Sequence, residues 1–152
     1  MTLDPSLIDI NELLYHEPPM VLLNSCTAAS ENSAECKVVI NRESLFASEQ
    51  GVPSYVAIEY MAQATAVFDG ISRRARGKKP KIGFLLGTRR LELMCDFFVF
   101  GMELLVKAER IWDGESVTQY QCKISDLSSG GVLSSANLTV YSPSVQSEAD
   151  ND

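Results

Sequence analysis

The sequence predicts a single α+β domain in which one antiparallel sheet wraps around a long central helix. The chain has 152 residues, of which 45% are hydrophobic and 22% are charged, and these values suit one globular domain with its own core. A single segment, from Pro53 to about Arg76, has the length and composition of a long helix. Most of the chain after Pro80 divides into strand-like runs separated by tight-turn residues, which supplies the sheet.

The first element expected is a short helix near the N-terminus. Asp9 and Glu12 have the spacing of a capping box, and apolar residues after Asp9 form one side of a helix. Pro18 and Pro19 end this helix, because a proline nitrogen has no proton to donate to helical hydrogen bonds. Two strands and then a loop are expected next, at residues 20–29, 34–40 and 41–52.

The long helix begins near Pro53, a residue tolerated in the first turn because the first N–H groups of a helix have no intrahelical acceptor. Its residues are apolar or small on nearly all sides: Val56, Ile58, Met61, Ala62, Thr65, Ala66 and Phe68. A helix of this kind is buried rather than lying on the surface. Its alanines predict that a sheet packs closely against it.

Four further strands are predicted at residues 81–93, 102–112, 115–126 and 132–141. Gly101, Asp113-Gly114 and the Ser-Ser-Gly-Gly run at 128–131 separate them, and Asp-Gly and Gly-Gly are strong hairpin signals. This order of elements fits a hot-dog fold over residues 1–141. A single layer of sheet leaves one face open, so we expect a dimer. Residues 142–152 are polar and acidic and are expected to form a disordered tail.

The charge distribution argues against one class of partner and suggests another. The formal net charge of −7 is unlike that of a general nucleic-acid-binding protein, which needs an excess of lysine and arginine. Basic residues are nevertheless concentrated just after the long helix: Arg73, Arg74, Arg76, Lys78, Lys79 and Lys81. This segment is either a docking site for an acidic partner or a solvated loop.

Cysteine usage and hydropathy point to a cytoplasmic protein. The four cysteines and the one histidine lack the spacing of a zinc site, and a domain of this size needs no disulfide framework. Acidic residues interrupt the N-terminal segment, which is therefore unlike a signal peptide. No apolar run reaches the ~18 residues of a membrane span. We therefore expect no metal and no membrane association.

A few polar residues and glycines are candidates for chemistry. Glu59 lies in the most apolar helix, and Gln63 follows one turn later on the same face. A buried carboxylate needs a partner or an opening to solvent, so Glu59 is either an active-site acid or a structural group. His16 precedes the two prolines; imidazole exchanges protons near neutral pH, although a lone histidine in a turn is more often structural. Gly83 and Gly87 mark a bulge or a close approach of a ligand.

Two segments resemble the 3-hydroxyacyl-(acyl carrier protein) dehydratases. His16-Glu-Pro-Pro-Met-Val-Leu-Leu is similar to their H-x-x-P-F/M-L-L segment. Residues 52–63, Val-Pro-Ser-Tyr-Val-Ala-Ile-Glu-Tyr-Met-Ala-Gln, resemble their P-G-V-L-x-x-E-A-x-A-Q helix. Looser matches occur at Gly87-Thr-Arg-Arg, Phe100-Gly-Met-Glu and Gly131-Val-Leu. The resemblance covers most of the chain, and the His-Glu-x-Pro-Met form is most similar to the branch found in bacterial aryl polyene pathways.

The chain also departs from the general dehydratases. Their catalytic histidine lies in a G-H-F-P segment, and the same offset from Glu59 falls here on Leu45; no histidine occurs between residues 41 and 58. The loop is also shorter, since Asn41, which aligns with the asparagine opening that segment, lies close before the helix. Ser54 replaces the glycine whose N–H meets the thioester carbonyl, although serine still supplies an N–H.

The resemblance implies a hydro-lyase that converts 3-hydroxyacyl thioesters on acyl carrier protein to trans-2-enoyl thioesters, in fatty-acid or aryl-polyene-type biosynthesis. Glu59 would be the acid for the leaving hydroxyl, Gln63 would orient it, and the Ser54 amide would polarise the thioester carbonyl. The role of His16 as the base is our own inference, because its position lies outside the family's usual catalytic pair.

The same interpretation assigns a substrate tunnel and a carrier-protein docking site. The tunnel residues are Tyr55, Met61, Gly83, Leu85 and Gly87, and the docking residues are Arg73, Arg74, Arg76, Lys78 and Lys79. No cofactor is expected beyond the phosphopantetheine arm that carries the substrate. Both a homodimer and a heterodimer with a related hot-dog subunit agree with the sequence.

Two other functions stay open at this point. Because the usual histidine is missing, the chain is alternatively an inactive partner subunit that completes a dimer with an active dehydratase. A hot-dog thioesterase also uses a helix carboxylate, but it hydrolyses the thioester and releases free thiol. The Met-Ala-Gln run after Glu59 favours the dehydratase over the thioesterase.

Overall fold

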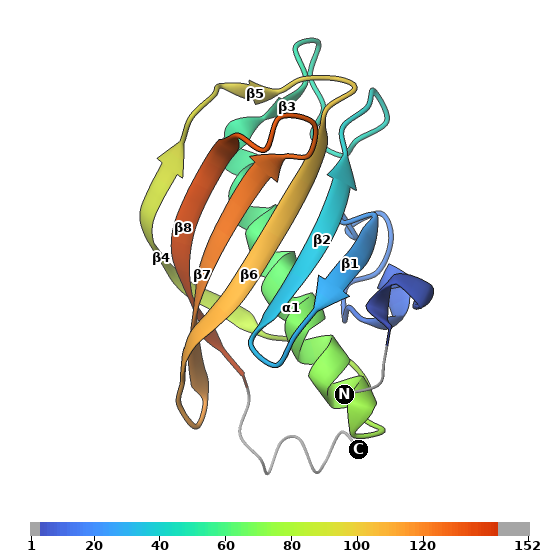
Figure 1. The fold of residues 1–152 in the computed structure, drawn as a ribbon, viewed down its shortest axis with the longest axis vertical. Coiled ribbons are helices and arrows are strands. Elements are labelled where there is room, and N and C mark those ends of the chain that lie inside the picture. Colours follow the sequence, from blue (N-terminus) through green and yellow to red (C-terminus); the bar gives the residue numbers. More distant parts are fainter. Residues whose placement is uncertain (1–3, 143–152) are drawn as a thin grey trace.

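The computed structural model describes residues 4–142 and shows an antiparallel sheet with one long helix against one of its faces (Figure 1). The main sheet has six strands in the order β1-β2-β6-β7-β8-β4. The strands are β1 (Ser25–Ala29), β2 (Ser33–Val39), β4 (Phe84–Leu93), β6 (Glu103–Asp113), β7 (Val117–Asp126) and β8 (Val132–Tyr141). The helix α1 spans Ala57–Ala75. The architecture is therefore the α+β arrangement that the element order predicts.

The core lies between α1 and the inner face of the sheet. Side chains alternate along a strand, and in β6 the buried residues Leu104, Val106 and Ala108 alternate with exposed or half-buried ones. Eleven of the residues of α1 are buried, on more than one side of the helix. The apolar character of this helix on nearly all sides follows from its position, because the sheet curls around it (Figure 1).

The first segments differ from the sequence prediction. Instead of one short α-helix, two 3₁₀ turns occur, at Pro5–Leu7 and Ile10–Glu12. Asp9 caps the second turn by accepting a hydrogen bond from the Asn11 N–H, two residues on; the capping box with Glu12 predicted here is therefore wrong. Single 3₁₀ turns suit a segment too short to propagate an α-helix.

The expected strand at residues 20–29 begins only at Ser25. The peptide bond between Pro18 and Pro19 is cis, and the chain after it does not join the sheet. A side chain of the helix binds two of its backbone groups, since Gln63 donates to the Met20 carbonyl and accepts from the Leu22 N–H, while the Asn24 N–H donates to the Lys37 carbonyl of β2. This side chain replaces the ladder that a longer strand would have provided.

The remaining boundaries differ by a few residues. Residues 81–83 lie before β4 rather than in it, and the helix is preceded by a 3₁₀ turn at Ser54–Val56. A short two-stranded sheet, β3 (Val52–Pro53) with β5 (Phe97–Phe98), was not predicted. The predicted tail stays a prediction for residues 143–152, which lie outside the described residues; Ser142 donates its N–H to the Ser116 carbonyl.

Gly70 allows the segment before His16 to lie directly on the helix. A Cβ at this position would be 2.0 Å from the Leu13 carbonyl oxygen, so only glycine permits the contact. Leu13 is fully buried. This contact places residues 13–16 against α1. Within residues 4–142, no helix combines the length and apolar character that crossing a membrane requires.

Candidate active site

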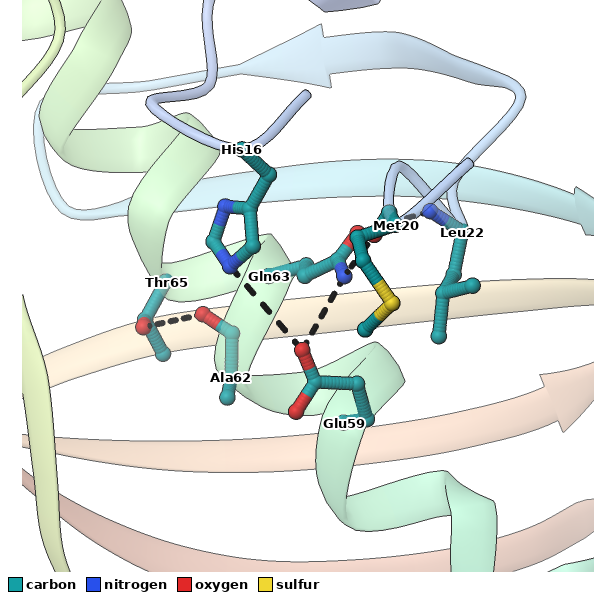
Figure 2. A network of polar contacts seen from close by, with 7 residues as sticks. All are labelled: His16, Met20, Leu22, Glu59, Ala62, Gln63 and Thr65. Atoms are coloured by element: carbon teal, nitrogen blue, oxygen red, sulfur yellow. Dashed lines mark hydrogen bonds and ion pairs between the residues drawn. The ribbon is translucent and has the colours of Figure 1, made fainter. Parts of the chain in front are cut away.

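Glu59, on the first turn of α1, is held in place by the fully buried side chain of Gln63 (Figure 2). The Gln63 amide nitrogen donates to Glu59 Oε1 at 3.0 Å and to the Met20 carbonyl at 2.8 Å. The Gln63 oxygen accepts from the Leu22 N–H at 2.9 Å. The spacing of four residues puts both side chains on one face of the helix. Gln63 thus joins the carboxylate to the segment that follows His16.

His16 faces the same carboxylate from the other side (Figure 2). Its Nε2 lies 3.9 Å from Glu59 Oε1, and the two side chains are 33% and 39% exposed. This separation is too long for a hydrogen bond. The other ring nitrogen, Nδ1, is buried and has no hydrogen-bond partner. Only Nε2 therefore faces both the carboxylate and the open side of the site.

His16 and Glu59 open into a cavity of about 180 Å³ that runs along α1. The helix contributes residues at spacings of three and four, Glu59, Ala62, Ala66 and Asp69, which share one face. Alanines at the middle of this face leave room that larger side chains would fill. Along this helix face the cavity is thus lined by the Glu59 carboxylate, then by two alanines, and then by the Asp69 carboxylate.

Two of the five predicted tunnel residues line this cavity, Gly83 and Leu85. The other three assignments are wrong for this cavity. Met61 is fully buried in the core, Tyr55 is 67% exposed before the helix begins, and Gly87 lies further along β4. The reason is helical periodicity: Met61 is two residues from Glu59, which places it about 200° around the helix.

The backbone N–H of Ser54 is not available to bind a substrate carbonyl. It donates to the Asp96 carbonyl at 2.9 Å, next to the β3–β5 pairing that the sequence did not predict. Ser54 itself is buried and does not line the cavity. The assignment of this amide to the thioester carbonyl is therefore corrected, because its hydrogen bond is already made.

The predicted docking residues divide into two kinds. Arg73 is only 4% exposed, and its Nε donates to the Lys79 carbonyl, so its assignment to a docking surface is wrong. Arg74 is exposed but lies 3.3 Å from Glu12 Oε1. Arg76 and Lys79 are exposed, and Lys78 is half-buried. The buried guanidinium of Arg73 thus holds the connection after the helix, and Arg76 and Lys79 are the members of the group that remain candidates for docking.

Several cavity residues were missed by the sequence analysis: Tyr15, Thr65, Asp69, Lys81, Thr118 and Tyr120. Asp69 could have been predicted from the sequence, because it continues the three- and four-residue spacing from Glu59 along one helix face. No sequence pattern predicted Tyr120, because it reaches the cavity from β7, a separate element. Burial raises the pKa of the Tyr120 hydroxyl well above its usual value, so this group is a neutral hydroxyl at physiological pH. Within residues 4–142 no cluster of three or more potential ligands is arranged to hold a metal ion.

Comparison with known proteins decides the family. The profile of the ApeP-like family, described as ApeP dehydratase, matches residues 8–151. The chain belongs to the ApeP-like dehydratases. A solved structure titled as the dehydratase heterocomplex ApeI:P from Xenorhabdus doucetiae is 30% identical, with a TM-score of 0.84 over 94% of this chain and 96% of that one. These two findings confirm the resemblance seen in the sequence, including the aryl polyene branch.

More distant solved structures share the fold of this ApeP-like chain. A hypothetical thioesterase with coenzyme A from Streptococcus pneumoniae has a TM-score of 0.62 at 12% identity, covering 79% of this chain and 85% of its own. A zebra fish thioesterase superfamily member has a TM-score of 0.62 at 10% identity, covering 78% and 80%. These likenesses confirm the hot-dog fold alone. No curated protein sequence matches the chain.

Proposed function

We propose that this chain dehydrates 3-hydroxyacyl thioesters presented by an acyl carrier protein, giving trans-2-enoyl thioesters. The observation that carries the proposal is that His16 Nε2 and Glu59 Oε1 lie 3.9 Å apart in the lining of one cavity. Dehydration needs a base for the α-proton and an acid for the departing hydroxyl. The two side chains supply one of each, and because no hydrogen bond closes the 3.9 Å between them, both can act on a substrate that lies alongside the pair.

The proposed reaction has one proton transfer at each side chain. His16 Nε2 removes the proton from the α-carbon, and the electron pair of that bond forms the new double bond to the β-carbon. The bond from the β-carbon to oxygen breaks, and the hydroxyl takes a proton from Glu59 and leaves as water. His16 is then protonated and Glu59 ionised. Because they face each other, the proton can return from one to the other.

Gln63 acts in this proposal as a positioning residue. Both protons of its amide are engaged, one by Glu59 Oε1 and one by the Met20 carbonyl. It therefore holds Oε1 still and leaves Oε2 for the substrate hydroxyl. Fixing the acid in this way lowers the cost of reaching the reactive geometry.

The acidic carrier protein is proposed to dock at the basic connection after α1. Arg76 and Lys79 are exposed there, and Lys81, two residues further along, lines the cavity. Basic side chains at the rim of a cavity attract an acidic partner and speed its association. Reversing the charge of Arg76 and Lys79 should therefore raise KM for carrier-bound substrate and leave kcat unchanged.

We also propose that the chain works beside a related hot-dog subunit. The ApeI:P relative is titled a heterocomplex, and β4 lies at the end of the sheet in this chain. Exposed apolar side chains at the start of this strand, Phe84, Leu85 and Leu86, are suited to contact another subunit. The heterocomplex favours a second candidate function, in which this chain completes the site of an active partner without turning over substrate itself.

A mass-spectrometric assay with a 3-hydroxyacyl carrier protein tests both functions. The wild-type chain, alone and with its partner subunit, is compared with Glu59→Gln and His16→Ala. Loss of one water by the wild type and by neither variant supports the proposed pair. Water loss that persists in His16→Ala would remove the base assignment. Turnover that requires the partner and survives both substitutions would favour the non-catalytic role, and release of free thiol would indicate a thioesterase.

A further inference from the structure

Two buried cysteines lie directly opposite each other in the hairpin of β1 and β2. Cys26 is the register partner of Cys36, and both side chains are fully buried in the core. Opposite residues of an antiparallel pair have Cβ atoms about 4.5–5.5 Å apart, and a disulfide needs about 3.5–4.5 Å. An approach of about 1 Å therefore brings the two sulfur atoms to bonding geometry.

The position of β1 in the sheet allows that approach. β1 is the first strand in the order, so within residues 4–142 only β2 pairs with it. The register shifts immediately after the cysteine, between Cys26 and Ala28, and such an irregularity interrupts the hydrogen-bond ladder. Edge strands also open locally more readily than central ones, which gives a small oxidant access to thiols that are buried in the closed structure.

The two thiols differ in reactivity. A hydrogen bond with the Cys36 side chain lowers the pKa of the Cys26 thiol. The same hydrogen bond and burial raise the pKa of Cys36 well above its usual value. The thiolate is the nucleophilic form of cysteine. Cys26 is therefore the expected nucleophile, and Cys36 is the thiol that completes a disulfide.

The other two cysteines provide internal comparisons, since all four are free thiols. Cys122 is also fully buried, but alanines lie opposite it on both sides, Ala108 in β6 and Ala136 in β8. Burial raises the pKa of Cys122 to about 12. Cys95 is the most accessible of the four, being only partly buried. Exposure alone would thus direct oxidation to Cys95, whereas pairing directs it to Cys26 and Cys36.

We propose that Cys26 and Cys36 are an oxidation site that forms a reversible cross-strand disulfide on reaction with hydrogen peroxide. The Cys26 thiolate attacks one peroxide oxygen, the O–O bond breaks, and the departing hydroxide takes up a proton, leaving a sulfenic acid on Cys26. The Cys36 sulfur then attacks the Cys26 sulfur, and the hydroxyl leaves with the Cys36 proton as water. Two thiols are oxidised and one peroxide is reduced, giving one disulfide and two waters. The disulfide fastens the edge strand β1 to β2, and a dithiol reverses it by exchange.

Peptide mapping of the full-length chain in its native assembly tests this site. After treatment with hydrogen peroxide, the remaining thiols are alkylated under denaturing conditions and the chain is digested with a protease that cleaves after glutamate. Glu31 and Glu35 lie between the two cysteines, so the disulfide joins two separate peptides, 18–31 and 36–43, which reduction releases. We expect this linked pair to form about tenfold faster than any oxidation of the other two cysteines.

Two variants separate the pair from ordinary oxidation of a buried thiol. Cys36→Ala removes the resolving thiol, so the sulfenic acid on Cys26 should persist and be trapped by dimedone. Cys122→Ala is the matched control, because it removes an equally buried cysteine and should leave the linked peptides unchanged. The wild-type peptide map decides the proposal even where a variant fails to fold.

Oxidation of Cys95 ahead of the pair would overturn the proposal, as would linked peptides that come from two different chains. Amide hydrogen exchange tests the consequence for the fold. Exchange in β1 should slow in the oxidised chain and return to its original rate after reduction. Unchanged exchange in a chain that carries the disulfide would overturn the fastening of β1 to β2.

Discussion

The two sides of the proposed acid–base pair are built differently. The Glu59 carboxylate sits on a helix and is bound by a fully buried glutamine that also bonds two backbone groups. His16 follows a 3₁₀ segment, and its Nδ1 has no hydrogen-bond partner. One group is fixed by hydrogen bonds and the other by packing of the preceding segment on α1. The difference predicts that the acid tolerates little displacement, whereas the position of the base depends on the packing of the buried residues Leu13 and Leu14, including the close contact at Gly70.

Removing the acid should have the largest effect. Glu59→Gln preserves the shape of the side chain and can still accept from Gln63, but its amide cannot give up a proton to the leaving hydroxyl. A general acid or base contributes about 10²- to 10⁴-fold, so kcat should fall by about a thousandfold. Thermal unfolding should be nearly unchanged. Retained turnover in the water-loss assay would show that Glu59 is not the acid.

Removing the base should have the next largest effect. His16→Ala leaves the Gln63 network intact and should lower kcat by about a hundredfold, with little change in KM. Tyr15→Phe is a matched control, because Tyr15 also lines the cavity from the same segment but has no assigned proton transfer. If the two variants lose activity equally, the segment matters for its shape rather than for the imidazole.

Replacing Gln63 tests whether its hydrogen bonds hold the Glu59 carboxylate in place. Gln63→Leu removes the part-buried hydrogen bonds of the Met20 carbonyl and the Leu22 N–H, which should lower the free energy of unfolding by about 2 kcal/mol. Turnover should fall by about tenfold, since Glu59 remains present but is less well held. Urea denaturation and the same assay measure the two effects. Ala66→Leu, on the same helix but without these hydrogen bonds, should narrow the cavity and leave the network intact.

Gly70→Ala tests whether packing of the preceding segment on α1 positions His16, and it should have the smallest effect on turnover. Its Cβ would meet the Leu13 carbonyl, so the segment carrying His16 must shift, at a cost of about 1–3 kcal/mol in the free energy of unfolding. We expect turnover to fall by less than about tenfold, and chiefly through displacement of His16. Ser72→Ala, at an exposed helix position, is the control. An unchanged free energy of unfolding would show that the close contact between Gly70 and Leu13 does not hold the segment in place.

Periodicity and turn chemistry were enough to predict most of the fold. Asp113-Gly114 and Gly130-Gly131 separate the strands where hairpins occur, and the strand at residues 132–141 matches β8. The spacing of Glu59 and Gln63 predicted that the two side chains share one helix face. These features are local, because they depend on residues within one or two turns of each other.

The errors arose where distant segments meet. The strand expected from residue 20 was shortened because Gln63 binds the Met20 and Leu22 backbone, more than 40 residues away. The Ser54 N–H was assigned to the thioester carbonyl of the substrate, but it donates a hydrogen bond to the Asp96 carbonyl. Arg73 was grouped with its exposed neighbours, although its side chain is buried. No local pattern encodes which of several hydrogen-bond donors a remote carbonyl will engage.

The sequence by itself determined the order of the long helix and the main strands, the family, and the identity of Glu59, Gln63 and His16 as the groups to examine. Only the tertiary structure decided that His16 faces Glu59 and that Asp69 and Tyr120 reach the same cavity. The physical reason is that secondary structure follows from residue periodicity along the chain. A site follows from the packing of separate elements, here through the Gly70 contact, whose geometry depends on a partner far away in sequence.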